Sequence, residues 1–173
     1  NVMLFSGSNR MLNAQSVPAT QANVDNAIAT IDKYEGGGST ELMPALRRVY
    51  AQAKSPSTSR SVIVVTDGYV SVETEAFKLI RENLNRANVF AFGIGSSVNR
   101  ELIEGMARAG MGEPFVITQP DQAKAQAERF RRMVRQPVLT SVKAEFEGVD
   151  VEGVVPEQLP DVLAERPVVV FGK

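Results

Sequence analysis

The sequence predicts an α/β protein built on an open, doubly wound and mostly parallel sheet. Two runs carry this prediction, residues 61–66 and 89–95, because both are short and continuously apolar, as parallel strands buried on both faces are. Segments with apolar residues at helical spacing alternate with these runs. This alternation of strands and helices is typical of a doubly wound sheet.

The composition agrees with one main folded core and excludes several kinds of site. The chain has 173 residues, of which 43% are hydrophobic and 23% charged, and no apolar run approaches the ~20 residues that a membrane helix needs. A net charge of −1 provides no basic field for nucleic acid. Because the chain contains neither Cys nor His, it has no disulfide, thiol nucleophile, histidine acid or base, or zinc site of the usual kind. Any metal would be a hard cation held by oxygen atoms.

The first part of the chain is expected to hold two strands and two helices. Residues 2–5 form an apolar run before a turn, which predicts a buried strand, and residues 11–17 alternate weakly before a proline, which predicts an edge strand. Thr20 can cap a helix that runs through residue 33. Thr40, which follows a glycine loop, can cap and open a second helix.

The middle of the chain is expected to continue the alternation. A helix over residues 73–86 follows the first buried strand, and Ser97 is expected to cap a helix over residues 98–109. Residues 115–118 predict a further strand, and a proline marks the start of a helix over residues 120–136. Each helix would cover a face of the sheet.

Residues 137–173 differ from the rest. They contain strand-like runs without helical periodicity, and three basic against seven acidic residues give them a net charge of −4. Residues 121–135, with five basic and two acidic residues, carry +3. We therefore expect a domain over residues 1–136 and a short β-rich segment over residues 137–173, the start of a neighbouring domain.

Two motifs could carry chemistry, and each also has a plain structural interpretation. The glycine loop at residues 36–38 could cradle a phosphate with its N–H groups, but no Lys follows it as in a P-loop. A plain turn between two helices, with Thr40 as the cap of the second, is the favoured interpretation of the two. Asp67 follows a predicted buried strand, where ligand crevices of open α/β sheets lie. The alternative is that Asp67 belongs to an Asp-Gly turn or caps the next helix. The two motifs together are more informative than either.

The two motifs are Gly-Gly-Ser-Thr-x-Leu before a helix and then Val-Ile-Val-Val-Thr-Asp-Gly in the next strand. Their order along the chain resembles that of a von Willebrand factor type A domain. Within that superfamily the chain is similar to the inter-alpha-trypsin inhibitor heavy chains and their bacterial relatives, with the closer likeness at residues 1–8 and 159–172. The resemblance extends over nearly the whole chain.

The resemblance implies a metal-ion-dependent adhesion site built from three loops. Thr40 matches the threonine of the second loop, and Asp67 matches the aspartate of the third. The first loop, Asp-x-Ser-x-Ser, is expected before Asn1, so the chain is expected to lack the first strand and helix of the family fold. In the parent protein the site would hold Mg²⁺, or Mn²⁺ or Ca²⁺, and a carboxylate from a protein ligand would complete the shell. With Thr40 and Asp67 alone, this chain should bind metal weakly or not detectably.

These features predict an adhesion or protein-interaction module that is not an enzyme. One alternative is a scaffold that packs against neighbouring domains of its own chain with a structural or vestigial metal site. A remoter one is a nucleotide-dependent or hydrolytic enzyme. Loss of the first strand would expose apolar edges, and we expect either pairing of strands between chains, that is, a dimer, or a rearranged sheet. The resembled proteins are secreted, periplasmic or cell-surface, and we expect neither nucleic-acid binding nor membrane insertion.

Overall fold

The computed structural model describes residues 1–55, 58–68, 71–135, 137–164 and 167–173. They form two compact units, Asn1–Ala53 and Lys54–Lys173. The predicted domain boundary at Gln136 and the predicted end of a helix there lie outside the described residues. The division into residues 1–136 and 137–173 stays a prediction.

The strands of the first unit are shorter than the sequence predicts. Strand β1 (Met3–Leu4) pairs with β2 (Arg10–Met11) in an antiparallel, two-stranded sheet, with Met3 opposite Met11. The prediction of a strand over residues 11–17 is wrong beyond Met11, and β1 is only half-buried. A two-stranded sheet of this size offers little area for burial, so an apolar run does not become a buried strand.

The two helices of this unit differ in burial. In α1 (Gln21–Asp32), the Thr20 hydroxyl accepts a hydrogen bond from the Asn23 N–H at 3.3 Å, which confirms the cap. No residue of α1 is buried, although its apolar residues have helical spacing. Helix α2 (Leu42–Ala51) buries four residues, Leu42, Ala45, Leu46 and Tyr50, and Val49 is half-buried. It begins after Glu41, so the prediction that Thr40 caps it is wrong.

The second unit contains the parallel sheet, which confirms the predicted fold class. Its strands are β3 (Ser61–Thr66), β4 (Asn88–Ile94) and β5 (Met111–Ile117), in the order β3-β4-β5. Both pairings are parallel, and Ile63 lies opposite Phe90 in the register. Strand β4 is buried from Asn88 through Gly93 because it lies between two strands and between two layers of helices.

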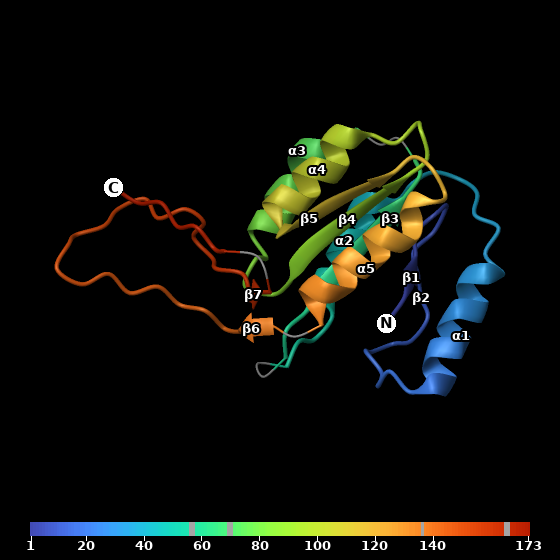
Figure 1. The fold of residues 1–173 in the computed structure, drawn as a ribbon, viewed down its shortest axis with the longest axis horizontal. Coiled ribbons are helices and arrows are strands. Elements are labelled where there is room, and N and C mark those ends of the chain that lie inside the picture. Colours follow the sequence, from blue (N-terminus) through green and yellow to red (C-terminus); the bar gives the residue numbers. More distant parts are fainter. Residues whose placement is uncertain (56–57, 69–70, 136, 165–166) are drawn as a thin grey trace. The chain divides into compact units, whose positions relative to one another are not determined.

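Helices cover both faces of this sheet (Figure 1). On one face lie α3 (Glu73–Arg81) and α4 (Arg100–Ala109), and on the other lies α5 (Gln122–Val134). Phe130 of α5 meets the rings of Phe90, Phe92 and Phe115 edge-on, at centroid distances of 5.0 to 6.0 Å. Ladders of parallel strands with helices on both faces are the doubly wound arrangement. None of the described helices has the length and apolar character to cross a membrane.

Three local predictions in this unit are corrected. Strand β3 is not buried on both faces, since Ile63 and Val65 are 46% and 48% exposed. Helix α4 is capped by Asn99, whose side-chain oxygen accepts the Leu102 N–H at 3.1 Å, and Ser97 lies outside it. Helix α3 ends at Arg81, five residues before the predicted end, and residues 82–86 form turns. Asn99 is the cap because it directly precedes Arg100, the first residue of the helix.

The segment after α5 has little regular structure. Strand β6 (Pro137–Leu139) pairs with β7 (Val162–Leu163) in an antiparallel sheet, and Val155 forms an isolated bridge with Phe171. The longer strands predicted here are therefore wrong in extent. Leu163 is 3% exposed and packs with Phe90 and Phe115 in the core.

Candidate functional site

Asp67 is the first residue after β3 and is exposed at the carboxyl end of the sheet. The buried Thr66 hydroxyl accepts a hydrogen bond from the Gly68 N–H at 3.1 Å, which bends the chain around Asp67. Since β3 and β4 are parallel, Gly95, which follows β4, belongs to the same edge. Within the described part of the chain, the Asp67 carboxylate has neither a hydrogen bond nor an ion pair.

A second carboxylate at the carboxyl end of the sheet is engaged. Glu73 begins α3, and its Oε1 accepts a hydrogen bond from the Asn99 side-chain amide at 2.6 Å. Asn99 thereby joins the first turns of α3 and α4 while it caps α4. Asn99 was not among the residues predicted from the sequence. The available signal was an Asn three residues before Leu102, the first buried residue of the helix.

Thr40, the other predicted metal ligand, lies in the first unit and is half-buried. It forms an isolated antiparallel bridge with Ser6. Its neighbours hold it in place, because the Gly7 N–H donates to the Ser39 carbonyl at 2.8 Å and the Glu41 N–H donates to the Phe5 carbonyl at 3.1 Å. The backbone around Thr40 is therefore part of a small ladder, and not the first turn of a helix.

The glycine loop before Thr40 packs against the turn that follows β1. The Ser6 hydroxyl donates to the Gly37 carbonyl at 2.6 Å and accepts from the Gly37 N–H at 3.0 Å. Gly38 has φ +84°, and a Cβ there would lie 2.8 Å from the Cα of Gly7. Only glycine fits such a close approach of two backbones. These contacts explain the glycines structurally, since the Gly37 N–H that could face a phosphate already has a partner.

The oxygen donors of Thr40 and Asp67 suit a hard cation, but they are few. A hydroxyl and a carboxylate supply two side-chain oxygens, whereas Mg²⁺ takes about six ligands in near-octahedral geometry. Among the residues that the structure describes, no three acidic side chains gather in a group that could hold a metal. Thr40 belongs to one compact unit and Asp67 to the other. Their pairing in one site therefore stays a prediction.

Comparisons with known proteins agree with the motifs. The profile of the von Willebrand factor type A domain matches residues 1–114. The chain is 29% identical over 162 residues to the human von Willebrand factor A domain-containing protein 5A and 26% identical over 177 residues to the rat protein of that name. A Dictyostelium discoideum protein, also named for a von Willebrand factor A domain, is 28% identical over 162 residues.

These alignments cover 91%, 100% and 92% of this chain, but only 21%, 21% and 8% of the human, rat and Dictyostelium proteins. The chain therefore spans about a fifth or less of the length of these relatives. Domains of this family are generally interaction modules and not enzymes. With the parallel sheet, the two motifs and the matched profile, the chain belongs to the von Willebrand factor type A domain family.

Proposed function

We propose that this domain captures an acidic group of a protein partner through a divalent metal site in its parent protein. The observation that supports this is the exposed carboxylate of Asp67 at the carboxyl end of β3, which has no internal partner among the described residues. Such an edge is where ligands bind in open α/β sheets. Asp67 and Thr40 would supply oxygen ligands for Mg²⁺, Mn²⁺ or Ca²⁺.

The remaining ligands of the site would come from an Asp-x-Ser-x-Ser loop of the parent protein that is not in this chain. A loop supplied from outside this chain accounts for the small number of oxygen donors here. We also propose that the parent protein is related to the inter-alpha-trypsin inhibitor heavy chains. Its location would be secreted, periplasmic or cell-surface. If a carboxylate of the partner protein binds the metal, binding of that partner would depend on divalent cations.

Calorimetric titration with Mn²⁺ tests the metal site. The 173-residue chain should show no binding in the micromolar range, whereas the parent protein should bind, and Asp67→Asn should weaken its binding by about tenfold or more. Asp150→Asn, which removes an exposed carboxylate from another segment, is the matched control and should change nothing. Micromolar binding by the short chain, or unchanged binding by the Asp67 variant of the parent, would contradict the proposal.

The exposed edge of the sheet also supports association between copies of this chain. Among the described residues, strand β3 has a sheet partner on one side, namely β4, and about half of the surface of Ile63 and of Val65 is open to water. Unpaired apolar edges promote strand pairing between chains. Light scattering over a range of concentrations should show a dimer, and a monomer at high concentration would count against it.

A further inference from the structure

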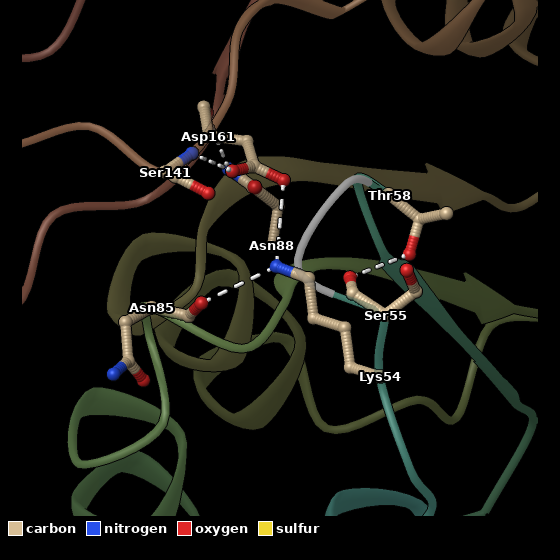
Figure 2. A network of polar contacts seen from close by, with 7 residues as sticks. All are labelled: Lys54, Ser55, Thr58, Asn85, Asn88, Ser141 and Asp161. Atoms are coloured by element: carbon tan, nitrogen blue, oxygen red, sulfur yellow. Dashed lines mark hydrogen bonds and ion pairs between the residues drawn. The ribbon is translucent and has the colours of Figure 1, made fainter.

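Four segments that are distant in the sequence meet at one buried carboxylate in the second unit (Figure 2). The Asp161 side chain is 5% exposed, and its Oδ1 accepts the Ser141 N–H at 3.2 Å. Its Oδ2 lies 3.8 Å from the Lys54 ammonium, and its carbonyl oxygen accepts from the Asn88 amide at 3.2 Å. Asp161 thus connects the segment after α5 with the residues before β3 and the first residue of β4.

The partners of Asp161 are held in place themselves. Lys54 also donates to the Asn85 carbonyl at 3.3 Å, and the Asn88 amide contacts the Met111 carbonyl at 3.4 Å. Asn88 is 1% exposed. A buried carboxylate is costly unless it is paired, and Asp161 Oδ2 has no hydrogen bond among the described residues. The ion pair with Lys54 compensates Oδ2, and the hydrogen bond from the Ser141 N–H compensates Oδ1.

Among the described residues after α5, Pro160, Asp161 and Leu163 are the ones that are fully buried. Val162 between them is half-buried, as are several other residues after position 150, whereas residues 139–150 are almost all exposed. Leu163 packs beside Phe90 and Phe115, and β7 pairs with β6. We name residues 160–163 the anchor.

The backbone opposite the anchor adopts a strained conformation. Ser141 has φ +55°, which is unfavourable for a residue with a side chain, and its N–H binds Asp161. Without the carboxylate this conformation would lose a compensating hydrogen bond. The strained backbone at Ser141 and the dependence on one ion pair among the described residues make this attachment easier to open than the sheet.

We propose that the anchor is a reversible latch: Asp161 fastens the segment after α5 to the amino-end edge of the sheet, and the segment can be released while β3, β4 and β5 stay folded. The latch lies where β4 begins, at the opposite edge of the sheet from Asp67. Release would uncover Leu163, Asn88 and Lys54 without disturbing the carboxyl end of the sheet. The proposal goes beyond the proposed function and does not depend on it.

Hydrogen exchange measured by mass spectrometry on the whole chain tests the latch. Asp161→Asn and Lys54→Met should each raise exchange about tenfold in residues 139–141 and 161–163, with little change in residues 89–94. The double variant should exchange no faster than the faster single variant, because the two side chains act as one pair. Lys54→Arg keeps the charge and should behave as the unchanged protein.

Asp150→Asn is the matched control, because it removes an exposed carboxylate from the same segment. Unchanged exchange in the Asp161 and Lys54 variants would overturn the latch. Equal acceleration in residues 89–94, or global unfolding of both variants, would also overturn it, since the pair would then support the whole unit. Additive effects in the double variant would show that the ion pair is not the fastening.

Discussion

Strands β3 and β4 are adjacent, parallel and almost equally apolar, yet they differ in burial. Phe90 of β4 is completely buried, while Ile63, its neighbour in the register on β3, is 46% exposed. Both side chains belong to the face of the sheet that α5 covers, where Phe130 reaches Phe90. A continuous apolar run thus predicts a strand, but the burial of that strand depends on the neighbouring strands and helices.

The opposite face of β3 shows that the difference concerns one side only. Val62 and Val64 are only 9% and 5% exposed, and their register neighbours Val89 and Ala91 are 0% exposed. Helix α4 packs on this face, where a Cβ on Gly93 would collide with Val98 and Ile103. Strand β3 lies at the edge of the described sheet and has one covered face, and the first two predictions below compare a buried position with an exposed one.

The largest effect is expected where the two strands differ most. Phe90→Ala should lower the free energy of unfolding by about 3–5 kcal/mol, because it leaves a cavity among aromatic rings. Ile63→Ala, at the same level of the sheet, should cost about 1 kcal/mol or less. Urea titrations of both variants measure this difference. Equal losses would show that α5 covers β3 as closely as it covers β4.

The second comparison lies within β3 itself. Val64→Ala removes buried methyl groups and should cost about 2 kcal/mol, whereas Val65→Ala on the exposed face should cost under about 1 kcal/mol. The two substitutions are chemically identical, so only their faces differ. Thermal unfolding followed by circular dichroism provides the measurement. A reversal of the order would mean that the open face of β3 becomes covered in solution.

A smaller effect is expected at the rim of the α5 face. The Arg129 guanidinium pairs with Glu113 and lies 5.6 Å from the centre of the Phe115 ring. Arg129→Met keeps much of the apolar stem and should cost about 0.5–1 kcal/mol, with less loss at high salt. Denaturant titrations at low and high salt compare the two conditions. A loss that is independent of salt would assign the effect to packing alone.

The smallest change in stability is expected for a charge on the open edge. Ile63→Lys should alter the free energy of unfolding by about 0.5 kcal/mol or less, since the side chain already reaches water. It should nevertheless weaken association between chains, because a lysine on an edge opposes strand pairing. Light scattering beside that of the unchanged chain measures this. Association that survives the substitution would place the dimer contact elsewhere.

Local sequence patterns determined much of the fold. Continuous apolar runs identified β3 and β4, and Thr20 marked the start of α1. Apolar residues at helical spacing identified α1, α2 and α3, while cap and proline signals identified α4 and α5. The same kind of signal failed at Ser97, where Asn99 is the cap, and at Thr40, which joins a ladder with Ser6. Several residues near a helix start can serve as a cap, and the choice depends on backbone geometry that sequence spacing does not specify.

The candidate site was predictable one residue at a time. Asp67 lies at the end of a strand, as the Thr-Asp-Gly pattern predicts. The bond between Asn99 and Glu73 was not predictable, since it joins two helices through a contact between side chains 26 residues apart. The packing role of Gly37 and Gly38 was not predictable either, because their contacts are with the turn after β1, about 30 residues earlier in the chain.

The sequence by itself determined the class of fold, the position of Asp67 and the absence of Cys and His chemistry, because these depend on short-range pattern and composition. Only the tertiary structure decided which strands are covered and where the last segment attaches. It showed β3 at an edge and Asp161 in a buried pair with Lys54. Burial is a property of neighbours brought together by folding, and apolar or charged residues alone do not identify those neighbours.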